Sequence, residues 1–366
     1  MTISVMNYTN KFCEIYGSSI INNDEFFGNI VVRKTNSLLI SIERDINELK
    51  LRKDNITEKE IDFMVHILTK LSFISRVNLI KAMNDIKRKD FKFSKEIKNS
   101  KHIIDYTLKN IVKIFIESEN DIDLYNRTIL LNNDIISHTN RVFFTVIKFI
   151  RYYNNCIDNN IVSDIRQNFK NKYLKYYKSV LKKFKINNDI NKLEDVYKYG
   201  LREIFIKEII EIAIASFWHD IANISPDYSP NSDDEYYASK GYSYLKYFIN
   251  YGDNISLIVG MHNEYFGYGK GIFLDYYNTA NNSEANYIVS FDYEDVLRLG
   301  SISYFPSKIL EIADLFDHLV YKYNESNSSK VLEYIREDYL NKEVKVDPII
   351  FDIFSSFVYS ENKLIA

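Results

Sequence analysis

Helix-breaking residues are scarce in this chain, and that scarcity constrains its fold more than any other feature. The 366 residues include only 10 glycines and 4 prolines. These two residues are the strongest helix breakers, because glycine loses the most backbone entropy on folding and proline lacks an N–H group. From about Ile103 onward, apolar residues recur at helical spacing in one segment after another. The sequence therefore predicts a mainly α-helical protein.

Four segments carry the helical pattern most clearly. Residues 57–87 begin with a threonine cap and an acidic first turn, residues 134–153 are amphipathic, and residues 309–323 follow a proline start signal. Residues 201–222 are almost continuously apolar, which predicts a buried central helix.

The N-terminal region has a different pattern. Residues 29–33 and 37–42 form strand-like apolar runs, and no motif there indicates a function. We expect a smaller N-terminal domain over residues 1–115, of mixed α/β structure and of regulatory or unknown role. A larger helical domain over residues 116–366 would follow, with an insertion at about residues 155–200.

Composition excludes several classes of function. The formal net charge of −3 provides no general attraction to nucleic acid or to membranes. Two cysteines cannot supply a disulfide framework or a cysteine-based zinc site. Neither a signal peptide nor an apolar run of roughly 20 residues is present, so we expect a cytoplasmic protein without a membrane or nucleic-acid polymer as partner.

Residues 166–185 interleave basic and aromatic side chains and allow two interpretations. The segment is either a contact for a nucleotide, RNA or acidic partner, or a solvated amphipathic helix. The negative charge of the whole chain favours the second.

Glycines cluster in one part of the chain. Six of the ten lie between residues 241 and 271, and three of them fall in the pentapeptide GYGKG at residues 267–271. This clustering predicts a loop with unusual backbone angles or close backbone approach, because glycine alone tolerates both at little cost.

A small set of histidines and aspartates is placed where charge is expensive. His219 and Asp220 are adjacent at the end of the most apolar segment, and Asp314 interrupts another apolar run. Burial there requires a partner or a metal ion. His138 shares a helix face with apolar residues, and Asp134 precedes it by one turn.

His262 completes this set, since it ends an apolar stretch and opens into the glycine loop. Imidazole and carboxylate ligands together suit Fe, Mn or Zn rather than a metal that needs thiolates.

Four motifs in order resemble the HD-GYP family, the branch of the HD superfamily that includes bacterial cyclic-di-GMP phosphodiesterases. They are HTNRV at residues 138–142, WHDIAN at 218–223, HNEYFGYGKG at 262–271 and ILEIADLFDHL at 309–319. The resemblance covers about residues 121–330, and four ordered motifs are far more selective than one.

The resemblance implies a helical bundle around a centre of two or three divalent metals, with Fe or Mn as the expected ions. His138, His219, Asp220 and Asp314 would hold the first metal, with Asp220 bridging to a second metal held by His262. Asp134 matches a position that helps to bind a third metal in some members. The implied activity is hydrolysis of cyclic di-GMP to pGpG or GMP by metal-activated hydroxide, with His219 and Asp220 as the catalytic pair.

The substrate side of the motifs departs from the family pattern. Tyr237 and Asn263 stand where the family has ligating histidines, Asn223 replaces a lysine, and the GYP motif is reduced to residues 269–271. We expect substrate contacts from two lysines, two loop glycines and two of the substituted positions: Lys270, Lys322, Gly267, Gly269, Asn223 and Tyr237.

Two alternatives stay open from the sequence. With the second metal site depleted, the chain is either a single-metal HD nucleotide phosphohydrolase or a degenerate module that binds cyclic di-GMP without turnover. Homodimerisation is also open.

Overall fold

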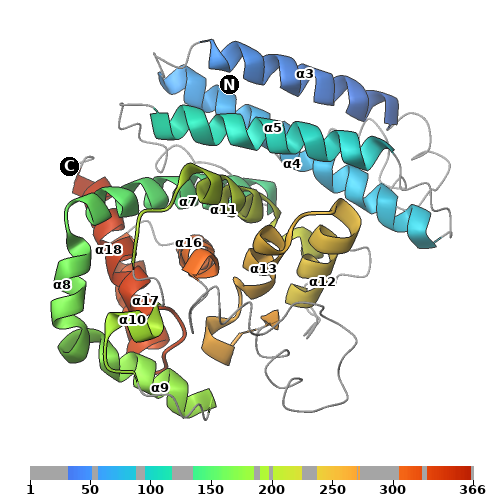
Figure 1. Ribbon diagram of the computed structural model, residues 1–366. Helices are drawn as coiled ribbons and strands as arrows, with labels where there is room; N and C mark the ends of the chain where they lie inside the picture. The colour runs from blue at the N-terminus through green and yellow to red at the C-terminus, as the bar shows by residue number, and fades with distance from the viewer. Residues whose placement is uncertain are drawn as a thin grey trace. The chain divides into compact units, whose positions relative to one another are not determined.

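The computed structural model describes residues 32–51, 57–87, 95–117, 135–184, 190–197, 201–224, 237–269, 271–272, 305–323 and 328–363. Every regular element in these ranges is a helix, which confirms the predicted mainly α fold (Figure 1). Among these helices, none is both long enough and apolar enough to cross a membrane. The chain divides into two compact units, residues 1–144 with 220–232 and residues 145–219 with 233–366. The boundary predicted between residues 115 and 116 stays a prediction.

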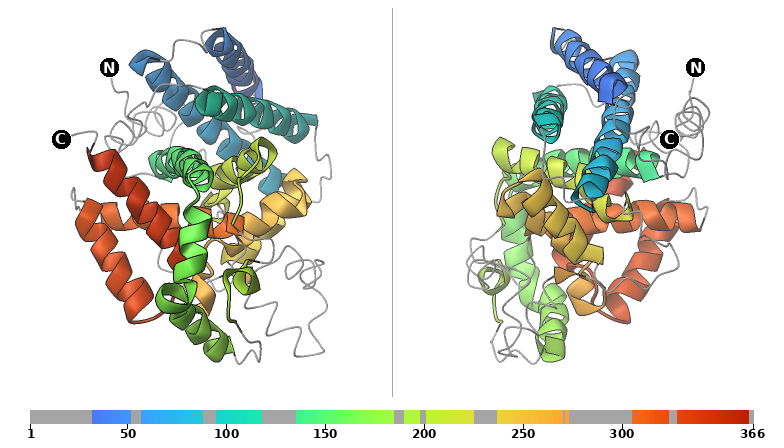
Figure 2. Two further views of the ribbon diagram at one scale, coloured as in Figure 1. Left: turned by 60° about the vertical axis from the view of Figure 1, so that its left-hand side comes forward. Right: turned by 90° about the vertical axis from the view of Figure 1, so that its right-hand side faces the viewer.

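Three helices form the basis of the first unit. They are α3 (Val32–Lys50), α4 (Glu58–Lys87) and α5 (Lys95–Glu117), and each packs against the other two (Figure 1, Figure 2). The unit also contains the start of α7 (Ile135–Asp158) and the 3-10 turn η4 (Ile221–Ile224), which packs on α4. Asn140 on α7 donates a hydrogen bond from Nδ2 to Thr69 Oγ1 at 2.8 Å, which ties α7 to α4.

The strand predicted at residues 37–42 is wrong, because this segment lies inside α3. Its buried side chains recur every three, four and three residues, the spacing of one helix face; they are Leu39, Ile42, Ile46 and Leu49. The other strand-like run, residues 29–33, lies mostly outside the described residues, and its last two residues belong to α3.

The start of α4 follows the predicted cap. The Thr57 backbone N–H donates to Glu60 Oε2 at 3.0 Å, and Thr57 Oγ1 accepts from the Lys59 N–H at 3.3 Å. These bonds satisfy N–H groups that lack a partner within the helix.

Short and medium helices make up the second unit. In chain order its elements are α8 (Ile161–Asn168), η3 (Phe169–Tyr173), α9 (Leu174–Phe184), α10 (Leu193–Val196), α11 (Ile206–Trp218), α12 (Tyr237–Ser243), η5 (Tyr244–Ile249), α13 (Asp253–Met261), η6 (Tyr265–Gly267), α16 (Phe305–Lys322), α17 (Ser328–Arg336), η7 (Glu337–Asn341) and α18 (Pro348–Lys363).

Helix α16 is the centre of this unit. Every residue from Ser307 to Asp317 is buried, and the helix packs against α11, α13, α17 and α18. Figure 1 shows it nearly end-on between these neighbours. A helix that is buried on all sides places even its charged residues inside the protein.

The helix predicted over residues 201–222 is shorter in the structure. Helix α11 begins at Ile206. Just before it, Asn154 Nδ2 donates a hydrogen bond to the Ile204 carbonyl oxygen and Asn154 Oδ1 accepts one from the Ile204 N–H, at 2.9 Å each. Those backbone groups are therefore satisfied by a side chain rather than by a further helical turn. The segment still supplies core residues, including the buried Trp218.

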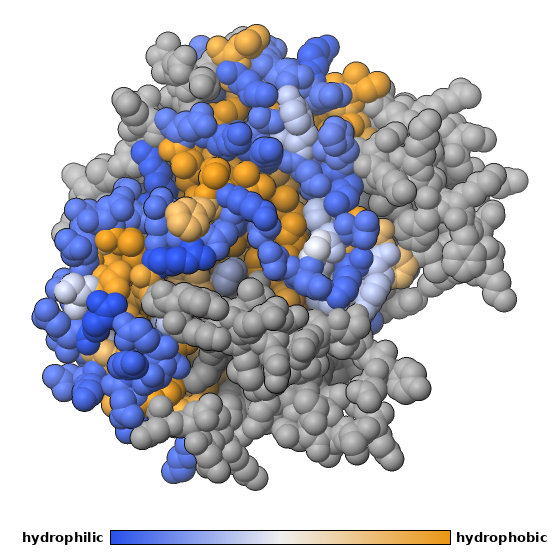
Figure 3. Space-filling model, in the orientation of Figure 1, coloured by the Kyte–Doolittle hydropathy of each residue, from blue (hydrophilic) through white to orange (hydrophobic). Residues whose placement is uncertain are grey.

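The region predicted as an insertion packs on α18. In the basic and aromatic segment, the rings of Phe169, Tyr173 and Tyr177 are buried, while most of its lysines are exposed. Tyr177 donates a hydrogen bond to Asp347 Oδ2 at 2.9 Å. The aromatic side chains of this segment therefore serve packing. On the face drawn in Figure 3, hydrophobic side chains gather in patches bordered by hydrophilic ones over the described surface.

Candidate metal centre

His219 lies directly after α11, and its ring orientation is set by the chain itself. Its Nδ1 is 2.7 Å from the backbone carbonyl oxygen of Ser216, three residues earlier. A carbonyl only accepts hydrogen bonds, so Nδ1 carries a proton, and whenever the ring is neutral its Nε2 presents the lone pair. The side chain of His219 has no exposed surface.

His262 repeats this arrangement at the end of α13. Its Nδ1 lies 2.6 Å from the carbonyl oxygen of Val259, again three residues earlier, and the residue is fully buried. The rings of His219 and His262 are 5.5 Å apart between centroids and nearly perpendicular, at 89°. Two buried imidazoles are therefore oriented by backbone carbonyls in the same way.

Asp314 on α16 faces both rings. Its Oδ1 is 3.6 Å from His219 Nε2, and its Oδ2 is 3.9 Å from His262 Nε2. Both distances exceed the range of N–H···O hydrogen bonds. When an imidazole is neutral, its Nε2 and a carboxylate oxygen are both electron donors, so a cation between Asp314 and either ring is favourable. An N–H held by a carbonyl is also the usual support of a metal-ligating histidine.

His138 and Asp220 form a second pair, within the first unit. His138 Nε2 lies 3.5 Å from Asp220 Oδ2, with 17% and 15% of the two side chains exposed. Asp220 follows His219 directly in the chain, so one peptide bond joins this pair to the cluster of His219, His262 and Asp314. We call these three residues the Asp314 cluster.

The loop after His262 has the unusual backbone that its glycines predict. Tyr265, Phe266 and Gly267 have φ values of 47°, 49° and 74°, all in the left-handed region. Tyrosine and phenylalanine rarely adopt such angles, so surrounding contacts must hold them. At Gly269 a side chain would collide with the backbone oxygen of Asn263.

Helix α16 supplies one of the contacts that hold this loop. Glu311, one turn before Asp314, accepts a hydrogen bond at Oε2 from the Tyr265 N–H at 3.0 Å. Lys308 Nζ is 2.8 Å from the same oxygen and 4.2 Å from the centroid of the Phe266 ring. Burial raises the pKa of the Glu311 carboxyl to about 7, against the opposing effect of Lys308.

The sequence reasoning missed Lys308 and Glu311. Their signal was present, because two opposite charges lie three residues apart in an apolar part of this helix. Such a pair inside a buried helix requires a local partner.

The predicted substrate contacts are described only in part. Lys270 lies outside the described residues, as does Asp134, which is predicted as a metal ligand. Asn223 belongs to η4 and Tyr237 begins α12, but their side chains are also outside the description. Lys322 ends α16, where its Nζ lies 5.5 Å from the centroid of the Tyr323 ring.

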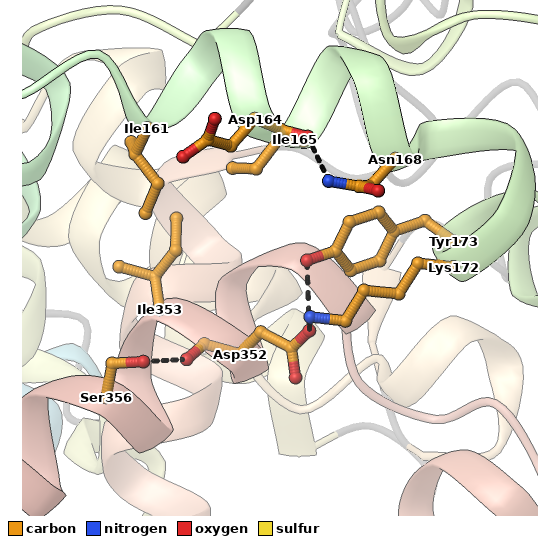
Figure 4. A pocket seen from close by; sticks show the side chains of 9 residues that line it. All are labelled: Ile161, Asp164, Ile165, Asn168, Lys172, Tyr173, Asp352, Ile353 and Ser356. Carbon is orange, nitrogen blue, oxygen red and sulfur yellow. Dashed lines mark hydrogen bonds and ion pairs between the residues drawn. The ribbon is translucent and has the colours of Figure 1, made fainter.

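A pocket of about 180 Å³ lies elsewhere in the second unit, between α8, η3 and α18. Figure 4 shows Lys172 and Tyr173 directed at Asp352, with Asp164 on the side of α8. Lys172 Nζ and Tyr173 Oη are 2.7 Å and 3.0 Å from Asp352 Oδ2. None of the predicted site residues lines this pocket.

Comparison with known proteins does not extend this description. No protein-family model matches the chain. Neither the curated proteins nor the solved structures contain a significant match.

Proposed function

We propose that this chain is a metal-dependent phosphohydrolase of the HD type that hydrolyses cyclic di-GMP. The observation that carries the proposal is the Asp314 cluster, in which one carboxylate faces two imidazoles whose Nδ1 atoms are held by backbone carbonyls. The ordered motifs that resemble the HD-GYP family support it independently.

Five residues would hold the metal ions. His138, His219, Asp220 and Asp314 would form the first site, and His262 would contribute to a second. A divalent ion bound there supplies Lewis acidity, which lowers the pKa of water and neutralises charge that develops on a phosphodiester.

The protein residues have separate tasks in this proposal. The carbonyls of Ser216 and Val259 fix the tautomers of His219 and His262, so both Nε2 atoms stay available as ligands. Burial of the two rings excludes water that would compete for these atoms. The Glu311 contact to Tyr265 holds the loop that follows His262 next to α16.

A single-metal nucleotide phosphohydrolase is the second candidate. Asn263 follows His262 where the family has a further histidine, and an asparagine amide is a weaker ligand than imidazole for Fe or Mn. A protein that binds cyclic di-GMP without turnover is the third outcome of the experiment below.

The test combines metal analysis with a hydrolysis assay. Wild type is compared with His219→Ala/Asp220→Ala and with His262→Ala, and His318→Ala serves as the matched control. His318 is an exposed histidine on the same helix as Asp314. Two metals per chain with hydrolysis of cyclic di-GMP support the proposal, and one metal favours the second candidate.

Three results would contradict the proposal. Metal-loaded wild type that leaves cyclic di-GMP intact rules out the phosphodiesterase. Activity that survives the double substitution rules out the site. Binding of cyclic di-GMP by a protein that contains no metal would show a sensor rather than a hydrolase.

A further inference from the structure

Two lysines from distant parts of the chain converge on one tyrosine. Lys183 at the end of α9 places its Nζ 2.9 Å from the centroid of the Tyr268 ring, and Lys345 places its Nζ 5.4 Å from the same centroid. Tyr268 is 43% exposed, so solutes can reach this group. Lys183 also donates a hydrogen bond to the carbonyl oxygen of Phe266 at 3.1 Å.

The positive charges of the two lysines repel each other. Burial lowers the pKa of Lys183, and the charge of Lys345 acts in the same direction, whereas Glu343 and Glu264 act against them. Glu343 Oε2 lies 3.0 Å from Lys345 Nζ, and 47% of the Glu343 side chain is exposed. An exposed ion pair between a carboxylate and an ammonium group contributes little free energy. An anion with more charge, such as phosphate, can therefore displace the Glu343 carboxylate from Lys345.

This group belongs to the loop that begins at His262. Tyr268 lies in that loop, and Lys345 is also 5.2 Å from the centroid of the Tyr339 ring. The rings of Tyr339 and Tyr265 are 6.0 Å apart. Tyr265 follows His262 by three residues and is bound to Glu311, one helical turn from Asp314. A series of contacts therefore links the two lysines and three tyrosines to Glu311, in the helical turn before Asp314.

We propose that Lys183 and Lys345 bind a phosphate group of the nucleotide beside the ring of Tyr268. Lysine ammonium groups carry the charge and the three donors that phosphate oxygens accept, and tyrosine rings provide faces on which a base can stack. The identity of the ligand rests on the proposed function. A cyclic dinucleotide has two phosphates, and the lysine pair takes the one that is not cleaved.

The test measures binding without turnover. Cyclic di-GMP and pyrophosphate are titrated calorimetrically into the full chain after treatment with EDTA. Lys183→Ala and Lys345→Ala each weaken binding of both probes by roughly 10-fold, the usual loss for one charge-assisted contact. Lys182→Ala, an exposed neighbour on α9 with the same change in net charge, leaves both affinities unchanged.

Glu343→Gln supplies a second, opposite readout. Removal of this carboxylate frees Lys345 and tightens pyrophosphate binding a few-fold, whereas the exposed Glu333→Gln on α17 has no effect. A merely structural role for Lys345 predicts no gain. Thermal melts followed by circular dichroism show whether Lys183→Ala keeps its fold, and Lys345→Ala carries the test if it does not.

The outcomes separate this inference from the proposed function. Wild type that binds neither probe, or variants that bind both probes as wild type does, would overturn the lysine site. A metal-loaded hydrolase whose KM is unchanged in both lysine variants also overturns it while keeping the function. A metal-free protein with lysine-dependent binding of pyrophosphate keeps the lysine site and ends the hydrolase proposal.

Discussion

Two aspartates on packed helices of the second unit differ in what faces them. Asp314 on α16 and Asp352 on α18 have similarly buried side chains, with 13% and 17% exposed. Asp352 receives Lys172 at 2.7 Å and the Tyr173 hydroxyl at 3.0 Å (Figure 4). Arg336 lies 3.5 Å from its other carboxylate oxygen. Asp314 faces the Nε2 atoms of two imidazoles.

This difference separates a structural carboxylate from a candidate ligand. Lysine and arginine balance the charge of Asp352, so its environment needs no added cation. Imidazoles carry no fixed positive charge, and with Nδ1 held by a carbonyl each ring beside Asp314 can offer its Nε2 lone pair, which is the donor set expected of a candidate metal site. Burial alone therefore does not distinguish the two aspartates, whereas the chemistry of their partners does.

Loss of the charge at Asp314 has the largest expected effect. Asp314→Asn lowers metal affinity by at least roughly 100-fold, since even a residue that only orients a ligand contributes about 10- to 100-fold. Asp352→Asn leaves metal content unchanged. Metal analysis after dialysis measures both variants, and equal metal loss in the two would remove the distinction between them.

Loss of a buried lysine that pairs with a carboxylate is expected to destabilise the protein more than loss of an exposed one. Lys308→Met leaves the buried Glu311 carboxyl without the cation that lowers its pKa, and breaking a buried pair of this kind costs about 3–5 kcal/mol of unfolding free energy at pH 8, where the wild-type carboxyl is mostly ionised. Lys172→Met removes a cation whose side chain is 55% exposed and costs less than about 1 kcal/mol. Urea unfolding measures both. Lys308→Met/Glu311→Gln recovers much of the loss, and a double variant as unstable as the single one contradicts this account.

Stability depends on pH through Glu311. The folded-state pKa of Glu311 is raised from 4.5 to about 7, so the folded protein keeps this proton at pH values where the unfolded chain has released it. Unfolding therefore releases a proton, and stability from this group is lost as pH rises from 4.5 to about 7. The full loss is about 3 kcal/mol.

Glu311→Gln isolates this effect, because glutamine does not titrate. The difference in unfolding free energy between wild type and Glu311→Gln is measured at several pH values by urea unfolding. We expect that difference to change across the window from pH 4.5 to 7 and to be constant above it. A constant difference throughout would show that Glu311 has an ordinary pKa.

The smallest expected effect concerns the Tyr173 hydroxyl, which donates to Asp352. Tyr173→Phe removes one hydrogen bond while the two cations remain, which lowers the unfolding free energy by about 1 kcal/mol. Tyr176→Phe is the control, because its exposed hydroxyl makes only a 3.4 Å bond to Asn341. Equal unfolding midpoints for the two variants would show that Asp352 depends on its cations alone.

Local patterns in the sequence predict most of the helices. The apolar spacing over residues 57–87 and 309–323 corresponds closely to α4 and α16. The strand predicted at residues 37–42 was wrong because a run of six residues is too short to show its period. Only the continuation of the pattern to Ile46 and Leu49 distinguishes the helix face of α3.

Charged and imidazole side chains in apolar segments also indicate His219, His262 and Asp314 as candidate ligands from the sequence alone. The sequence could not show that both histidines face the Asp314 carboxylate, because that depends on how α11, α13 and α16 cross. Helix crossing is decided by side-chain packing between segments far apart in the chain and has no local signal. The same limit applies to Lys183 and Lys345, which the sequence shows only as two lysines among many. Local sequence patterns thus predict most of the helices and the candidate ligands, whereas packing between distant segments brings these residues face to face.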